Sequence, residues 1–195
     1  MITIEDNVFG KEFHSDILKY CKQDAVFKSY KVGNKFFYSD VSNTEKLQEP
    51  IIKHLESDTV EISPIFSYYR MATDELDTDW RIHCDRKIFD KEPTNACIYY
   101  ITTTDEKLNG TGVWIHKKYG RYCPKITDKE FDRLLNEDAN NLINWNIDFI
   151  ISGVEDRLIT YPSNMFHSKY PKQAWGKTQK NCRIIFCMFY KKYEK

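Results

Sequence analysis

Six short segments between residues 61 and 190 constrain the fold most, because they are rich in β-branched and aromatic residues. They are EISPIFSYYRMA (61–72), WRIHCD (80–85), NACIYYIT (95–102), TGVWIH (111–116), RLITYP (157–162) and CRIIFCMFY (182–190). Runs of this kind, separated by turn residues, predict strands. Helices do not alternate with them, which argues against a doubly wound parallel sheet. An antiparallel barrel or sandwich with helices packed on one side fits this order better.

Three segments show helical patterns instead. Residues 13–22 predict a short helix, and a spacing of four between apolar residues over 44–55 predicts a second one. A third helix is expected at about 127–145, where Thr127 and Glu130 fit a capping box at its start.

We expect a single domain over residues 1–195, because no repeat, low-complexity stretch or linker interrupts the chain. Residues 1–61 would supply supporting helices and a hairpin with Gly33-Asn34 at its turn. Residues 62–190 would form the core, with a helical insert at about 116–150.

Composition excludes several classes of protein. Lys plus Arg and Asp plus Glu both number 29, so the net formal charge is zero. A protein that coats nucleic acid needs a large positive field, which this chain lacks. No apolar run approaches the 18 residues of a membrane span. The six cysteines form no C-x-x-C pair and follow no secretory signal, so we expect reduced thiols in a cytoplasmic protein.

The charged runs near these strands are expected to be solvated loops. They are the acidic run at 74–79 and the basic stretch at 117–125. The alternative is that they form a rim around a substrate site, because long connections at such a rim often shape access.

His83 and Asp85 are the first candidates for chemistry. Side chains two residues apart on a strand point to the same face, so this pair could bind one metal ion while Ile82 and Cys84 face the other way. An H-x-D pattern also occurs often by chance, and the alternative for this pair taken alone is a surface strand end. His167, which follows a Pro-Ser-Asn turn, could supply a third ligand. Two histidines and one carboxylate suit non-heme Fe(II), with Zn(II) as the competing metal.

Arg183 opens the last strand, whose two faces are both apolar. That strand should therefore be buried, and a buried arginine needs an anion close to it. A structural salt bridge to an acidic side chain is one explanation. Bidentate binding of a ligand carboxylate is the other.

The chain resembles the Fe(II)/2-oxoglutarate-dependent dioxygenases, in particular the prolyl-hydroxylase-like branch. The resemblance lies in the residues His83, Asp85, His167 and Arg183 and in their order along the chain. The resemblance covers roughly residues 62–190 and includes the strands at 96–101 and 109–115. It implies a mainly β fold with flanking α-helices around a double-stranded β-helix, also called a jelly roll or cupin-like core.

The resemblance also implies site residues and an activity. Fe(II) would be bound by the two histidines and the aspartate, and the far carboxylate of 2-oxoglutarate would pair with Arg183. Tyr100 matches a tyrosine that hydrogen-bonds this carboxylate, and Tyr69 is a second candidate; core packing is the alternative for both. O2 and 2-oxoglutarate would become succinate and CO2 while an unactivated C–H bond is hydroxylated.

The chain departs from the family's pattern around the co-substrate pocket. The stretch from His167 to Arg183 is long, and Ile185 stands where many members have a serine or threonine. We expect a protein, peptide, amino-acid or other small-molecule substrate and no membrane partner. The alternatives are a non-catalytic jelly-roll binding module, a nucleic-acid-modifying dioxygenase and a zinc hydrolase. The last would need a general-base glutamate, as in H-E-x-x-H, which the sequence lacks.

Overall fold

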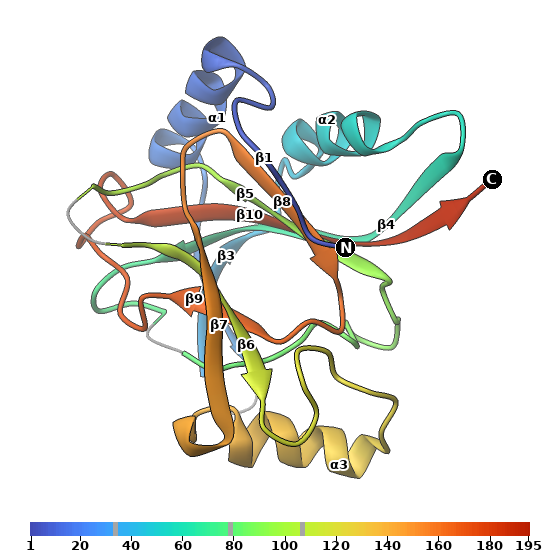
Figure 1. Ribbon diagram of the computed structural model, residues 1–195. Coiled ribbons are helices and arrows are strands. Elements are labelled where there is room, and N and C mark those ends of the chain that lie inside the picture. Colours follow the sequence, from blue (N-terminus) through green and yellow to red (C-terminus); the bar gives the residue numbers. More distant parts are fainter. Residues whose placement is uncertain (33–34, 78–79, 106–107) are drawn as a thin grey trace.

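The computed structural model describes residues 1–32, 35–77, 80–105 and 108–195. Two antiparallel sheets lie against each other, and two helices cover the outer face of the larger sheet (Figure 1). The prediction of a mainly β fold with flanking α-helices is confirmed. The predicted turn at Gly33-Asn34 lies outside the described residues.

The larger sheet has the long last strand of the chain at its centre. Within the described residues its order is β1 (Thr3–Glu5), β8 (Arg157–Pro162), β5 (Asn95–Tyr100), β10 (Arg183–Glu194), β4 (Val60–Ala72), β3 (Lys35–Asp40) and β2 (Lys28–Val32). Strand β10 pairs with β5 on one side and with β4 on the other. Its first eight residues are buried, as its two apolar faces predict.

The smaller sheet completes the jelly roll. Its described strands are, in order, β7 (Trp145–Ser152), β6 (Gly110–His116) and β9 (His167–Tyr170). An isolated bridge between His83 and His167 places the segment 81–85 beside β9 as a short fourth strand. Two layers of strands thus face each other. One contains β8, β5, β10 and β4, and the other contains β7, β6, β9 and the segment 81–85. Apolar side chains from both layers fill the space between them. This arrangement is the predicted double-stranded β-helix.

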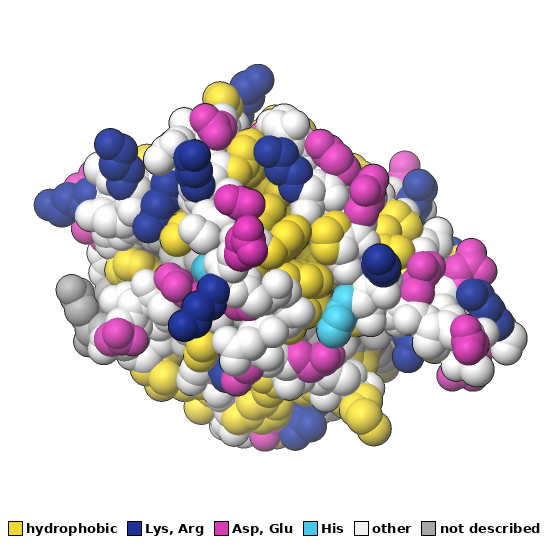
Figure 2. Space-filling model, turned by 90° about the horizontal axis from the view of Figure 1, so that it is seen from above, with side chains coloured by type: hydrophobic (Ala, Val, Ile, Leu, Met, Phe, Trp, Pro, Cys, Tyr) yellow, Lys and Arg dark blue, Asp and Glu magenta, His cyan; other side chains and the backbone are white. Residues whose placement is uncertain are grey.

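The helices pack where their apolar faces predict. Helices α1 (Lys11–Gln23) and α2 (Glu45–Leu55) bury Ile17, Leu47 and Ile51 against the outer face of the larger sheet. Seen from this side, acidic and basic side chains are interspersed around a strip of hydrophobic ones (Figure 2).

The connection between β6 and β7 is helical. Helix α3 (Asp128–Arg133) continues into a π-helical turn (Leu134–Asp138), and a 3-10 turn (Leu142–Asn144) follows. The predicted capping box is confirmed, because the side chains of Thr127 and Glu130 each accept a hydrogen bond from the other's backbone N–H.

The six cysteines are all buried and none forms a disulfide. None of the helices in the described part of the chain is long and apolar enough to cross a membrane.

Candidate metal centre and its pocket

Three side chains with metal-binding atoms meet at the edge of the smaller sheet. Nε2 of His83 lies 3.8 Å from Oδ1 of Asp85, and Nε2 of His167 lies 3.4 Å from Oδ2 of Asp85. One donor atom from each residue lies within 4.8 Å of the others, so the three can hold one metal ion together. The expected strand parity is present, because Ile82 and Cys84 pack into a separate apolar cluster.

The hydrogen bonds of the two histidines fix their tautomers. Nδ1 of His83 lies 3.1 Å from the carbonyl oxygen of Arg81, and Nδ1 of His167 lies 3.0 Å from that of Met165. A carbonyl oxygen can only accept, so each Nδ1 carries the proton. Each Nε2 therefore presents its lone pair to the centre, as metal-binding histidines do.

Burial adjusts the charges of the centre in opposite directions. It lowers the pKa of His83, and the nearby His167 and Arg81 lower it further. The imidazole is therefore neutral at neutral pH, which is the form that binds metals. Burial raises the pKa of Asp85, although His167 and Tyr161 oppose this shift. A bound cation would favour the ionised carboxylate.

Arg183 is buried at the start of β10, with only 2% of its surface exposed. Among the described residues, Nε and Nη1 have no hydrogen-bond partner, and Nη2 lies 3.5 Å from the carbonyl oxygen of Gly110. Burial lowers the pKa of this guanidinium. No described carboxylate pairs with it, so a structural salt bridge does not account for its burial. An incompletely bonded buried cation fits an anionic ligand.

The triad and Arg183 line one open pocket between the two sheets, with an empty volume of about 380 Å³ that includes its mouth. The structure thus brings together four of the six predicted site residues. Asp85 is the only carboxylate among the described lining residues.

The two predicted tyrosines lie in different places. The Tyr100 hydroxyl is 2.7 Å from Oγ1 of Thr111, a residue that lines the pocket. Tyr69 is not brought to the pocket, because the alternation of β4 turns its ring to the outer face, against Tyr20. The neighbouring Tyr68 lines the pocket instead.

No protein-family model and no curated protein matches the chain by sequence. Several solved structures nevertheless match it over almost its whole length. The non-heme alpha ketoglutarate dependent epimerase SnoN from nogalamycin biosynthesis has a TM-score of 0.64 and 9% identity, and the match covers 100% of this chain and 81% of SnoN.

Two other matches have the same fold. For an oxidoreductase of the 2OG-Fe(II) oxygenase family from Burkholderia pseudomallei, the TM-score is 0.53 at 8% identity, covering 97% of this chain and 85% of that one. For a prolyl-4-hydroxylase from Pseudomonas putida, the TM-score is 0.53 at 9% identity, covering 97% and 91%. The chain has the fold of the 2OG-Fe(II) oxygenases. At this identity the likeness concerns the fold, and the function has to be argued from the site.

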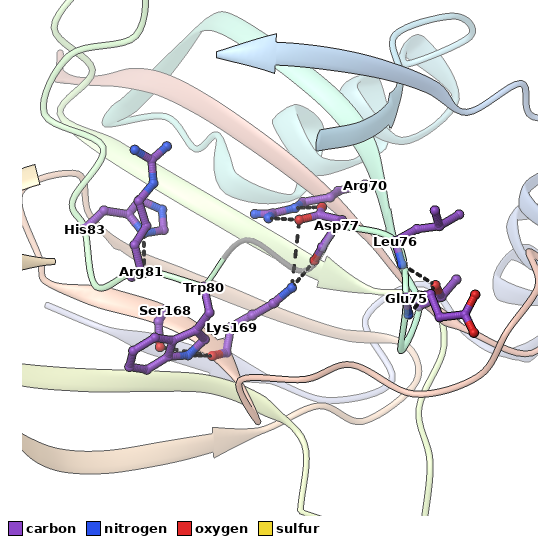
Figure 3. Close-up of polar contacts among 10 residues, drawn as sticks. Arg70, Glu75, Leu76, Asp77, Trp80, Arg81, His83, Ser168 and Lys169 are labelled. Atoms are coloured by element: carbon purple, nitrogen blue, oxygen red, sulfur yellow. Dashed lines mark hydrogen bonds and ion pairs between the residues drawn. The ribbon is translucent and has the colours of Figure 1, made fainter. Parts of the chain in front are cut away.

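A buried ion network crosses this oxygenase fold beside the pocket (Figure 3). Nε and Nη2 of Arg70 donate to the carboxylate of Asp77 at 2.6 and 2.7 Å. Nζ of Lys169 lies 3.8 Å from Oδ1 of Asp77 and also donates to its backbone carbonyl. The network joins β4 to β9 across the pocket wall. The prediction that the acidic run is a solvated loop is wrong for Asp77, which is 2% exposed.

Several residues of the pocket were not predicted. Tyr161 donates a hydrogen bond of 3.3 Å to Oδ2 of Asp85, and its hydroxyl lies 3.3 Å from Nε2 of His167. Both faces of β8 are buried, so its sequence carries no alternation that could have singled out this tyrosine. Tyr68 could have been found, because it shares a face of β4 with Arg70, whose charge marks the less apolar side.

Proposed function

We propose that the protein is an Fe(II)- and 2-oxoglutarate-dependent dioxygenase. The observation that carries the proposal is the incompletely bonded, buried guanidinium of Arg183 in the same pocket as the triad. A metal site alone suits many reactions. A metal site together with a buried cation suits a co-substrate that binds a metal at one end and carries a carboxylate at the other.

The donor set supports iron. His83, Asp85 and His167 offer two nitrogen atoms and one oxygen atom, which leave adjacent coordination positions open on non-heme Fe(II). The competing zinc hydrolase would need a general base beside its metal. The described pocket walls contain no glutamate for this role. A zinc hydrolase mechanism also gives no role to the buried side chain of Arg183.

The buried part of the pocket, where Arg183 lies, supports 2-oxoglutarate. The planar guanidinium of Arg183 can receive the far carboxylate through two parallel hydrogen bonds. Tyr100 and Thr111 share a hydroxyl hydrogen bond near this end, so either hydroxyl could donate to the same carboxylate. When bound, Fe(II) and 2-oxoglutarate would supply the activation of O2, with one oxygen atom going to succinate as CO2 is lost and the other to the substrate.

The protein's own residues would position and protect this chemistry. His83 and His167 are held by backbone carbonyls, and Tyr161 holds Asp85. Apolar side chains such as Ile98 and Ile185 line the pocket and limit water around the centre. Catalysis would need no further acid or base.

We propose hydroxylation of an unactivated C–H bond of a protein or peptide side chain, an amino acid or a related small molecule. Similar folds include prolyl hydroxylases, which supports the first group. They also include an epimerase and a carbocyclase of nogalamycin biosynthesis, which supports a small molecule.

The test is anaerobic titration of the metal-free protein with Fe(II) and then 2-oxoglutarate. We expect the visible charge-transfer band of the chelated iron. The band should be absent in His83→Ala and present in the control His54→Ala, whose imidazole pairs with Glu5 outside the pocket. Arg183→Ala should still bind iron but need much more 2-oxoglutarate. Absence of the band from the unmodified protein would overturn the proposal.

A further inference from the structure

The pocket runs along the inner face of the β4–β10 pair and differs at its two ends. Arg183 lies at the buried end, and Phe189 lines the pocket six residues further along the same strand. Six residues of strand span about 20 Å. In the register of the two strands Phe189 stands beside Phe66, which is only half-buried. The pocket therefore has a closed cationic end and a more open aromatic end.

Four aromatic rings, which we call the aromatic ledge, connect the pocket to the surface. Tyr68 and Phe189 line the pocket, with ring centroids 6.2 Å apart. Phe66 lies 5.4 Å from Tyr68 and 5.2 Å from Phe89, which it meets edge to face. The ledge thus leads from the walls that hold the triad to Phe89 at the surface.

Phe89 occupies a position that folding alone does not explain. It is 73% exposed and has a φ of 52°, in the left-handed region. It lies in a two-residue turn, where Ile88 and Lys91 exchange backbone hydrogen bonds of 2.9 and 3.0 Å. Glycine, asparagine or aspartate is usual at such a position. A large ring there is unfavourable both for its backbone and for its exposure, and such features cluster at ligand sites.

We propose that the aromatic ledge is a substrate subsite for a flat apolar group, most simply an aromatic ring, and that Phe89 determines this specificity. The inference rests on the proposed function, because 2-oxoglutarate would fill the end closed by Arg183 and leave the open end to the substrate. A ring seated against Phe66 and Phe89 would cover the exposed ring and gain edge-to-face contacts. Because the aromatic ledge is continuous with the pocket, a C–H bond next to the substrate's ring would lie near the triad.

The test uses protein loaded with Mn(II) and 2-oxoglutarate, with N-acetyl-L-phenylalaninamide as the aromatic probe and N-acetyl-L-alaninamide as the aliphatic one. Mn(II) broadens the NMR signals of protons that approach the triad. We expect strong broadening for the phenyl protons and little for the aliphatic probe. Phe89→Ala and Phe66→Ala should reduce the broadening at least fivefold. Ile143→Ala, which changes an equally exposed side chain outside the pocket, should not.

A second variant separates binding from folding. Phe89→Asn suits the left-handed backbone, so it should unfold at the same or a higher temperature and yet lose the broadening at least fivefold. Equal broadening of both probes, or unchanged broadening in Phe89→Asn, would overturn the inference. Failure of the unmodified protein to bind Mn(II) or 2-oxoglutarate would instead overturn the proposed function.

Discussion

The backbones of His83 and His167 exchange two hydrogen bonds, with N···O distances of 2.9 and 2.8 Å. This pair fixes two candidate ligands from distant parts of the sequence relative to each other. Their imidazole centroids lie 4.5 Å apart. Because the backbone positions the two rings, a change confined to a side chain should affect metal binding more than folding.

The first prediction concerns the contribution of the metal to stability. A metal ion that binds only the folded state at 100 times its dissociation constant adds about 2.7 kcal/mol to the free energy of unfolding. Anaerobic Fe(II) should therefore raise the unfolding temperature of the unmodified protein and of His54→Ala, but not that of His167→Ala. Thermal unfolding followed by circular dichroism measures this. A rise in His167→Ala would exclude His167 as a ligand.

The second prediction concerns Tyr161, whose hydroxyl donates to Asp85 and lies 3.3 Å from Nε2 of His167. Loss of a hydrogen bond that orients a metal ligand commonly lowers metal affinity by about 10- to 100-fold. Tyr161→Phe should therefore weaken Co(II) binding to this extent in an isothermal titration.

A matched control is Tyr99→Phe. The Tyr99 hydroxyl is also buried, but it bonds to His14 and Asp156 near the N-terminus. It should reduce stability and leave Co(II) affinity unchanged. Equal affinities for both variants would mean that the Tyr161 hydroxyl does not orient Asp85.

The parts of the site that could be predicted depend on short-range rules. Strand parity was enough to place His83 with Asp85, and two apolar faces were enough to bury the strand of Arg183. These inferences need only neighbouring residues. Strand β9 has only four residues, of which His167, Ser168 and Lys169 are buried and polar, so its sequence carries no apolar pattern.

Other features depend on contacts between distant segments. Asp77 belongs to an acidic run that indicates a solvated loop, and only the approach of Arg70 and Lys169 explains its burial. Tyr68 and Tyr69 are chemically identical neighbours, and the local sequence marks which of them faces the pocket only through Arg70, which shares its face of β4 with Tyr68.

The third prediction uses the unusual bonding of Arg183. A buried cation with two unbonded nitrogen atoms destabilises the folded protein, so an apolar side chain of similar length should stabilise it. We expect Arg183→Met to raise the free energy of unfolding of the metal-free protein by about 1–3 kcal/mol. Urea unfolding measures this change. The same variant should lose 2-oxoglutarate binding, because no cation then faces its far carboxylate. A destabilised variant would indicate that Arg183 is bonded within the fold and serves a structural role.

The fourth prediction concerns the buried network of Arg70, Asp77 and Lys169. Removing one partner of a buried ion pair leaves an uncompensated charge and costs about 3–5 kcal/mol. Asp77→Asn should lower the free energy of unfolding by this amount. The control Asp6→Asn breaks the half-exposed pair of Asp6 with Arg157 and should cost less than about 1 kcal/mol. Combining Asp77→Asn with Arg70→Met should recover part of the loss in urea unfolding, because the guanidinium that faced the Asp77 carboxylate is then absent. If the two losses simply add, Arg70 and Asp77 do not stabilise each other.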